Sequence, residues 1–445
     1  MVEEILDVLR SQGQISEEQY HELLQKAQAE EAKRGETRQG KEIGKQEPHA
    51  TKGEETAAAK KTKVAIPMYG YWKNGLAFES ADRKFTAKIG GRINVDAGEV
   101  DTDHDVKKFF DNQFGSGVNF RRARLSFEAT IYHDIMLKSE YDFTSGETKF
   151  KDVYVGMRGL PYVGTLRIGH QKEPFSLEEI ISGNYVTFME RALPNGFVPD
   201  RNTGLGLNNT VLDRRMTWAV GGFRETDNQG SGLGNPENYN VTARVTGLPW
   251  YRDKGSRLLH LGLSYSHKFV DKGGTVRFRS RPETQLTSER FVDTGSILAD
   301  DVDLLAPAAA VVFGPLSFQG EYIYSHVDPK QGSSLDFDGY YIYGSYFLTG
   351  EHRSYSTSHG AFSRIRPKKN FQLHGGGWGA WEVALRYSHM DLDDEDVEGG
   401  KLSDITAGLN WYLNPSVRIM FNYIHADLDH VGDTNIYQSR FQINL

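Results

Sequence analysis

Residues 119–133 constrain the fold more than any other stretch of the chain. Apolar and polar side chains alternate along it with a period of two, and a β-strand has that period because successive side chains point to opposite faces. One face holds Ala123, Leu125, Phe127, Ala129 and Ile131, and the other holds Arg122, Arg124, Ser126, Glu128 and Thr130. In a soluble barrel or sandwich the apolar face is the core. In a transmembrane barrel it meets lipid, and the charges line a wet lumen.

The composition excludes several classes of protein. The mean hydropathy of the 445 residues is −0.55, and no run approaches the roughly 18 to 20 apolar residues of a membrane helix. A membrane barrel stays open because it needs only alternating apolar positions. The net charge of −8 argues against nucleic acid as the main partner. The absence of cysteine fits an oxidising compartment.

The alternation begins at Phe85 and continues almost to the C-terminus. Aromatic residues end several apolar faces, as the interfacial girdles of membrane barrels require. Tight turns at 133–134 and 414–415 alternate with polar stretches at 101–117, 225–237 and 391–401, which we predict to be long loops. At about 22 residues per strand and connection, residues 85–445 hold about 16 strands. We therefore predict an all-β fold, a transmembrane antiparallel β-barrel of about 16 strands with a short helical N-terminal extension.

The N-terminal residues have a different character. Residues 1–30 predict an amphipathic helical or coiled-coil segment, with a capping box at Ser16 and Gln19, although a frayed tail is the alternative. Residues 31–63 predict a flexible charged linker. The predicted barrel unit spans 64–445 and starts with a short strand or hairpin around residues 69–78.

Residues 1–10 lack the basic start and apolar core of a signal peptide, which an outer-membrane protein carries before export. We expect the sequence to be a mature or truncated form, or its start to be misassigned.

Arginines are concentrated on the predicted polar faces. Arg277, Arg279 and Arg281 share one face of an extended segment, about 6.5 to 7 Å apart. Such a row suits passing an anion from site to site, whereas a solvated charged edge is the alternative. The first interpretation is favoured because seven more arginines fall on the polar faces of their strands: Arg92, Arg122, Arg124, Arg158, Arg244, Arg386 and Arg418.

Residues 172–200 form an insertion longer than a turn, with a predicted short helix at 177–182. We predict that it folds into the lumen and narrows it, so that Lys172 and Arg191 face the arginines of the opening strand. An ordinary external loop is the alternative.

The sequence contains no enzymatic constellation. The histidines occur singly and no glycine-rich loop opens a helix. The acidic run at 391–398 lacks the spacing and central glycine of an EF-hand loop. We predict no catalytic residues, no cofactor and no metal site.

Seven motifs together resemble the phosphate-selective porin O/P family over residues 75–445: 88–92, 120–124, 140–143, 186–191, 346–351, 381–387 and 409–412. The resemblance implies a 16-stranded barrel in the outer membrane of a Gram-negative bacterium. It also implies a homotrimer in which each pore has an arginine ladder that leads to a phosphate site.

Several residues match the functional positions of that family. The double arginine of its anion site falls on Arg121 and Arg122, and ladder arginines fall on Arg92, Arg191, Arg277, Arg279 and Arg281. Arg124 and Lys172 replace two tyrosines that narrow the site, and a loop lysine falls near Asn184, so a more basic site is expected. Alternation puts Arg121 on the apolar side. Either a bulge turns it inward or it lies at a subunit contact.

We interpret the chain as a passive outer-membrane channel for phosphate or a related oxyanion. The alternatives are a general or sugar-selective porin, and a structural envelope barrel that acts through its N-terminal helices.

Overall fold

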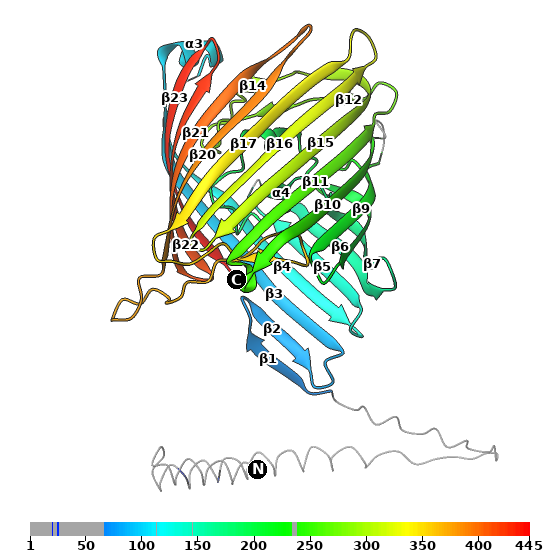
Figure 1. Ribbon diagram of the computed structural model, residues 1–445, viewed down its shortest axis with the longest axis vertical. Helices are drawn as coiled ribbons and strands as arrows, with labels where there is room; N and C mark the ends of the chain where they lie inside the picture. Colours follow the sequence, from blue (N-terminus) through cyan, green and yellow to red (C-terminus); the bar gives the residue numbers. More distant parts are fainter. Residues whose placement is uncertain (1–19, 21–24, 26–65, 113, 145, 234–237) are drawn as a thin grey trace, which may run out of the picture. The chain divides into compact units, whose positions relative to one another are not determined.

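A computed structural model describes residues 20, 25, 66–112, 114–144, 146–233 and 238–445 of the chain (Figure 1). The predicted helical segment at 1–30, apart from residues 20 and 25, and the predicted linker at 31–63 lie outside these residues. Among the described helices, none is long and apolar enough to cross a membrane.

Sixteen antiparallel strands form a closed barrel, each paired with its neighbours in sequence order. The strands are β3 (Phe85–Thr102), β4 (Ser116–Ile131), β5 (Ile135–Asp142), β6 (Lys149–Leu160), β7 (Gly164–Lys172), β8 (Arg201–Val211), β9 (Met216–Arg224), β10 (Tyr239–Arg252), β11 (Arg257–Phe269), β15 (Ile297–Phe313), β16 (Leu316–Pro329), β17 (Leu335–Phe347), β20 (Ala380–Asp394), β21 (Val397–Asn414), β22 (Val417–Leu428) and β23 (Gly432–Asn444). The last strand, β23, pairs with β3 and closes the barrel. The predicted all-β barrel of about 16 strands is confirmed.

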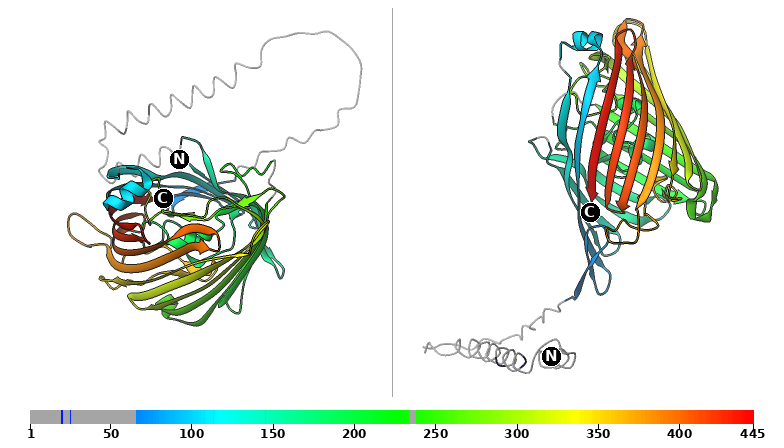
Figure 2. Two further views of the ribbon diagram at one scale, coloured as in Figure 1. Left: turned by 90° about the horizontal axis from the view of Figure 1, so that it is seen from above. Right: turned by 90° about the vertical axis from the view of Figure 1, so that its left-hand side faces the viewer.

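The hairpin predicted around residues 69–78 is also present. It consists of β1 (Met68–Trp72) and β2 (Leu76–Ser80). Strand β2 pairs with residues 86–89 of β3, whereas β23 pairs with residues 92–102 of the same strand. The hairpin therefore continues the sheet below the point where β23 ends (Figure 2).

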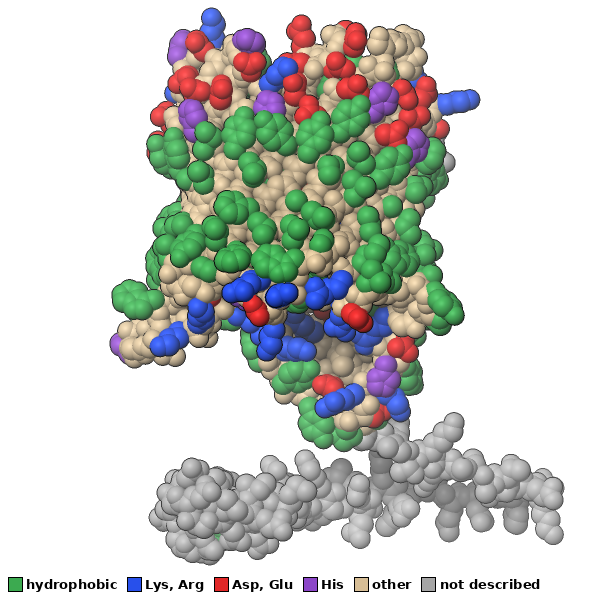
Figure 3. Space-filling model, in the orientation of Figure 1, with side chains coloured by type: hydrophobic (Ala, Val, Ile, Leu, Met, Phe, Trp, Pro, Cys, Tyr) green, Lys and Arg blue, Asp and Glu red, His purple; other side chains and the backbone are tan. Residues whose placement is uncertain are grey.

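The outer surface shows the inverted polarity of a membrane barrel. Leu125, Phe127 and Ile131 of β4 are exposed, whereas Arg122 of the same strand is buried on the inner side. Figure 3 shows hydrophobic side chains around the wall, with acidic and histidine side chains above them and lysines and arginines below them. The apolar faces therefore point outward. Of the two arrangements that the alternation in residues 119–133 allows, this is the one of a transmembrane barrel.

The connections differ between the two ends of the barrel. The turn end, which also holds Leu445, has short connections such as 132–134, 314–315 and 415–416, and η2 (Asp253–Gly255). The loop end has four long ones: residues 103–115 with α3 (His104–Phe110), residues 173–200 with α4 (Leu177–Ile180) and η1 (Leu193–Phe197), residues 225–238, of which 234–237 lie outside the described residues, and residues 270–296 with β12 (Thr275–Val276), β13 (Arg279–Ser280) and β14 (Val292–Asp293). One long connection, residues 348–379 with β18 (Tyr355–Ser356) and β19 (Ala361–Phe362), lies at the turn end.

The long loop predicted at 391–401 is wrong. Strands β20 and β21 continue through this acidic run, with Asp393 opposite Glu398, and only residues 395–396 form the turn. Strand pairing depends on backbone hydrogen bonds, and charged side chains can remain hydrated while these bonds form. The polar composition of residues 391–401 therefore did not distinguish a strand from a loop.

The barrel interior is not uniformly polar. The inner face of β15 to β22 near the loop end carries apolar side chains, including Leu304, Ile323, Phe337, Met390 and Ile424. They pack against Phe175, Leu193 and Phe197 of the 173–200 segment and Phe278 and Phe291 of the 270–296 segment. The two inserted segments therefore build an apolar core inside this half of the barrel.

Candidate functional site

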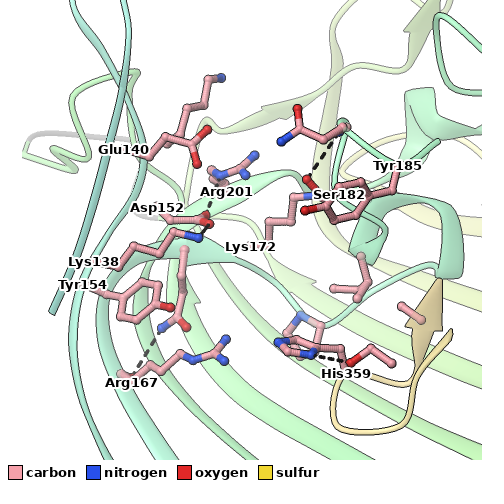
Figure 4. A pocket seen from close by; sticks show the side chains of 18 of the residues that line it. Lys138, Glu140, Asp152, Tyr154, Arg167, Lys172, Ser182, Tyr185, Arg201 and His359 are labelled. Atoms are coloured by element: carbon pink, nitrogen blue, oxygen red, sulfur yellow. Dashed lines mark hydrogen bonds and ion pairs between the residues drawn. The ribbon is translucent and has the colours of Figure 1, made fainter. Parts of the chain in front are cut away.

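A cavity of about 560 Å³ lies between the 173–200 segment and the inner wall of β3 to β9 (Figure 4). Thirteen lysines and arginines line it, against four aspartates and glutamates. The basic residues include Arg92, Arg121, Arg122, Arg124, Lys172 and Arg191. Guanidinium and ammonium groups only donate hydrogen bonds, so this lining suits an anion.

Arg121 reaches the cavity through a β-bulge. In the β3–β4 ladder Asn94 pairs with Arg122 and Val95 pairs with Phe120, so Arg121 is the extra residue of β4. Its guanidinium donates two hydrogen bonds to the Glu190 carboxylate of the 173–200 segment, both of 2.9 Å. The bulge keeps Phe120 outward and turns Arg121 inward, because an extra residue shifts the alternation by one position.

A second arginine also binds the Glu190 carboxylate. Arg440 of β23 donates to it at 2.6 Å and also binds Asp96 of β3 through two hydrogen bonds of 2.7 and 2.6 Å. Burial alone would raise the pKa of Glu190, but Arg121, Arg440 and Arg122 outweigh it and hold that pKa well below its usual range. Glu190 therefore stays ionised and balances part of the arginine charge.

Arg122 and Arg92 lie on the wall opposite Gly183. A Cβ placed on Gly183 would lie 3.4 Å from Arg92 Nη1 and 3.6 Å from Arg122 Cζ. Arg122 forms no ion pair within the described residues. In the amide orientation that satisfies both its oxygen and its nitrogen, Asn94 accepts a hydrogen bond of 3.1 Å from Arg122 Nη1. Arg92 donates to Glu140 at 3.1 Å. The narrow space beside Gly183 thus holds one guanidinium, that of Arg122, with no ion-pair partner among the described residues.

Arg124 and Lys172 are both neutralised by carboxylates. Arg124 donates to Asp142 at 2.6 Å and to Glu140 at 2.9 Å. Lys172 lies 2.6 Å from Glu179 of the 173–200 segment. These two positions are basic, as the sequence indicated, but their charge is already paired inside the barrel.

Arg191 lies within the 173–200 segment and braces its fold. Its guanidinium donates to the carbonyl oxygens of Glu178, Glu179 and Ile181 at 3.0 to 3.1 Å. The Glu179 carboxylate lies 3.2 Å away. The hydrogen bonds of Arg191 therefore stabilise the internal fold of the 173–200 segment.

Arg277, Arg279 and Arg281 are not brought to the cavity wall; they lie on the 270–296 segment. Arg277 forms a double hydrogen bond with Asp293, and Arg281 donates to Gln285 at 2.7 Å. The side chain of Arg279 forms no hydrogen bond or ion pair within the described residues, although its backbone pairs with Asp293 in the β13–β14 ladder. Partial burial, followed by repulsion from Arg281 and Arg279, lowers the pKa of the adjacent Arg290 to about 10. The charges of this row are thus close enough to repel one another.

The family model for the phosphate-selective porins O and P matches residues 87–445. The chain belongs to this porin family. A Caulobacter vibrioides protein known only as uncharacterized is 31% identical over 382 residues, covering 83% of this chain and 74% of that protein. Porin O of Pseudomonas aeruginosa is 25% identical over 403 residues, covering 82% and 88%.

Solved structures agree on the fold. The anion-selective porin from Comamonas acidovorans superposes with a TM-score of 0.52 at 12% identity, covering 81% of this chain and all of that one. This porin is therefore a passive outer-membrane channel of a Gram-negative bacterium and not an enzyme.

Sequence reasoning missed Arg440, and it missed that Arg386 and Arg418 help to tie the 173–200 segment to the far wall of the porin. Arg418 donates to Val186 O (2.8 Å), Arg440 to Met189 O and Arg386 to Glu190 O (3.1 Å). Arg386 also binds Glu283 of the 270–296 segment and lies 3.4 Å from Glu178. Arg386 and Arg418 do occupy the polar faces of their strands, but they anchor the segment and do not line the cavity.

Another predicted member of the inward set lies elsewhere. Arg158 is exposed at the turn end, where its Nε donates to His133 O at 2.6 Å. The β6–β7 register shifts between Met157 and Leu160, so the alternation does not carry Arg158 into the lumen.

The part of the cavity nearer the turn end has mixed charge (Figure 4). Asp152 lies 3.1 Å from Lys138 and accepts a 2.9 Å hydrogen bond from Arg201. Arg167 lies over the Tyr154 ring at 5.3 Å from its centroid and has no carboxylate partner among the described residues. This part of the cavity therefore holds cations that are paired with a carboxylate, Lys138 and Arg201, beside one that is not, Arg167.

Proposed function

We propose that this porin is an anion-selective diffusion channel whose favoured solute is phosphate or a related oxyanion. The observation that carries the proposal is the cavity lining, in which thirteen basic residues oppose four acidic ones. Membership of a family described as phosphate-selective supports the choice of solute.

The mechanism is electrostatic. Arginines replace part of the anion's hydration shell with charge-assisted hydrogen bonds. At an effective dielectric constant near 20, two unit charges 4 Å apart interact by about 4 kcal/mol. One unpaired guanidinium, Arg122, therefore suffices to attract an ion into the space beside Gly183. Because Glu140 and Glu190 already compensate the neighbouring arginines, the ion is not trapped there.

The row Arg277, Arg279 and Arg281 supplies the approach to this site in the proposal. Partial burial, followed by repulsion from Arg121, lowers the pKa of Arg281, and this supports an approach that ends near the bulge residue. Anions would then pass from the 270–296 segment to Arg121 and Arg122.

The family resemblance also supports a homotrimer. Native mass spectrometry of detergent-extracted protein is expected to show three chains per particle. A spectrum with only monomers would contradict this assembly.

Single-channel recording in planar bilayers tests the proposed function. We expect reversal potentials in a salt gradient to show anion selectivity, and phosphate to block the chloride current in a saturable way. Cation selectivity, or a chloride current that phosphate leaves unchanged, would refute the proposal.

A general or sugar-selective porin is the second candidate, and one observation favours it. Carboxylates already pair with Arg92, Arg121, Arg124 and Lys172, so the constriction charges are largely balanced. Liposome swelling separates the candidates, because a general pore admits neutral sugars at rates set by size, whereas an anion-selective pore admits them poorly.

A further inference from the structure

One motif recurs on the outer face of the barrel. A tyrosine and a histidine two residues later occur on four strands: Tyr265 and His267, Tyr324 and His326, Tyr387 and His389, and Tyr423 and His425. In each pair the tyrosine hydroxyl and histidine Nδ1 contact the same side-chain oxygen on a neighbouring strand. Figure 3 shows a row of histidines along the upper edge of the hydrophobic surface, at the loop end. We call each arrangement a tyrosine–histidine clasp.

The shared oxygen differs between the clasps. It belongs to Asp303 in the His267 clasp and to Asp336 in the His326 clasp. It belongs to Ser403 in the His389 clasp and to Asn435 in the His425 clasp. Only the first two therefore combine an imidazole with a carboxylate on the shared oxygen.

The His267 clasp has a second carboxylate beside it. Asp301 lies two residues before Asp303 on β15, and one donor atom from each of His267, Asp301 and Asp303 lies within 4.8 Å of the other two. Within the described part of the chain, no other three histidine, aspartate or glutamate residues meet so closely. His267 Nδ1 lies 2.8 Å from Asp303 Oδ1.

Few positive groups compensate the carboxylates at this place: within the described residues Asp303 has His267 beside it, and Asp328 Oδ1 lies 3.6 Å from His326 Nε2. Asp301 lies directly opposite Asp328 in the β15–β16 ladder, and like charges in that position repel. No lysine or arginine among the described residues forms an ion pair with Asp301, Asp303 or Asp328; Lys330 reaches only the adjacent Asp300, at 3.8 Å. A bound cation would remove the repulsion that the register imposes.

We propose that His267, Asp301 and Asp303 bind a divalent transition-metal ion on the outer face of the porin, with Asp328 as the facing carboxylate. One imidazole with several carboxylate oxygens is a donor set that suits Zn²⁺, Mn²⁺ or Co²⁺. The ion joins β11, β15 and β16 at the loop end. The site lies outside the barrel and is independent of the proposed channel function.

Calorimetric titration of the full chain in detergent with Zn²⁺, after removal of metals with a chelator, tests the proposal. We expect one tight site per chain. His267→Gln and Asp303→Asn are each expected to weaken binding by at least about tenfold, because each removes one ligand.

His425→Gln is the matched control, because it changes a clasp whose shared oxygen belongs to Asn435. The chain has 14 histidines, so this control separates the site from weak surface binding. It is expected to bind Zn²⁺ like the unchanged protein.

Asp301→Asn is a further variant that is not expected to disturb folding. Among the described residues, the side chain of Asp301 has no hydrogen bond to lose apart from its contact with Asp328. It is expected to weaken Zn²⁺ binding and leave single-channel conductance unchanged. Absence of a tight site in the unchanged protein, equal binding by Asp301→Asn, or equal weakening by His425→Gln would overturn the proposal.

Discussion

Arg122 and Arg124 lie two residues apart on β4 and point to the same side of the strand, but they differ in whether a carboxylate neutralises their charge. Arg124 is held by two carboxylates, whereas Arg122 has only the Asn94 amide. A guanidinium without a counter-charge can give its donors to a passing anion, whereas a paired one must first break its ion pair. Anion affinity is therefore expected to depend on Arg122 more than on Arg124.

Replacing Arg122 tests this directly. Arg122→Ala is expected to raise the half-blocking concentration of phosphate by about tenfold to a hundredfold, because a hydrogen bond to a charged group contributes about 1.5 to 3 kcal/mol. The measurement is phosphate block of the chloride current in bilayers. Arg158→Ala, at an exposed position away from the cavity, is the control and should leave the block unchanged. An unaltered block in Arg122→Ala would remove Arg122 from the site.

Gly183 sets the space beside the same guanidinium. Gly183→Val places methyl groups against Arg92 and Arg122, where a Cβ alone already comes within 3.4 Å. The single-channel conductance is expected to fall to less than about half, because the added carbons occupy the ion's path. Gly222→Val is the comparison, since a Cβ at Gly222 meets nothing within 4 Å. Equal conductance in both variants would place the narrow point elsewhere.

Among the elements, the 173–200 segment depends on buried ion pairs with the opposite wall. Arg440 is fully buried between Asp96 and Glu190. Arg440→Leu leaves the Asp96 carboxylate buried without its ion-pair partner, while Glu190 keeps Arg121, and breaking a buried pair costs about 3 to 5 kcal/mol. We expect a lower unfolding temperature together with a larger and less anion-selective conductance, because the segment loses its hold on β23.

Lys401→Leu provides the reference for that variant. It removes the partly exposed pair with Asp391 on the outer face, and such pairs contribute at most about 1 kcal/mol. If Arg440→Leu and Lys401→Leu unfold at the same temperature, the buried pair does not stabilise the porin in the way described.

The strands were predictable from sequence, but the contents of the barrel were not. Alternation depends on nearest neighbours along the chain, so it gave the barrel class and the strand number. The sequence did not decide whether β4 has a bulge at Arg121, because the alternation shifts inside a run of arginines. The partners Glu190 for Arg121 and Glu283 for Arg386 lie 69 and 103 residues away, and no periodicity connects such positions. The inward position of Arg440 could have been predicted from the sequence, because Arg440 lies on the opposite face of its strand from the apolar residues Tyr437, Phe441 and Ile443.

At the scale of the whole molecule, the barrel closes on itself without residues 1–63. Strand β23 bonds to β3, and Leu445 N donates to Gly91 O at 2.8 Å. A protein that lacks residues 1–63 is expected to insert into bilayers and conduct with unchanged selectivity. Bilayer recording of the shortened and full chains side by side measures this. Loss of conductance in the shortened protein would favour the alternative in which the N-terminal segment is the functional part.

The division of the barrel interior bears on how such a channel evolves. On the side of β15 to β23 many inward side chains are packed into the apolar core or bonded to an inserted segment, so most replacements of those residues lower stability. On the side of β3 to β9 several side chains face only the cavity, and exchanging them leaves the packing intact. Solute preference can therefore drift by single substitutions along one wall while the opposite wall preserves the fold. Libraries randomised on the two walls should differ sharply in the fraction of clones that still assemble.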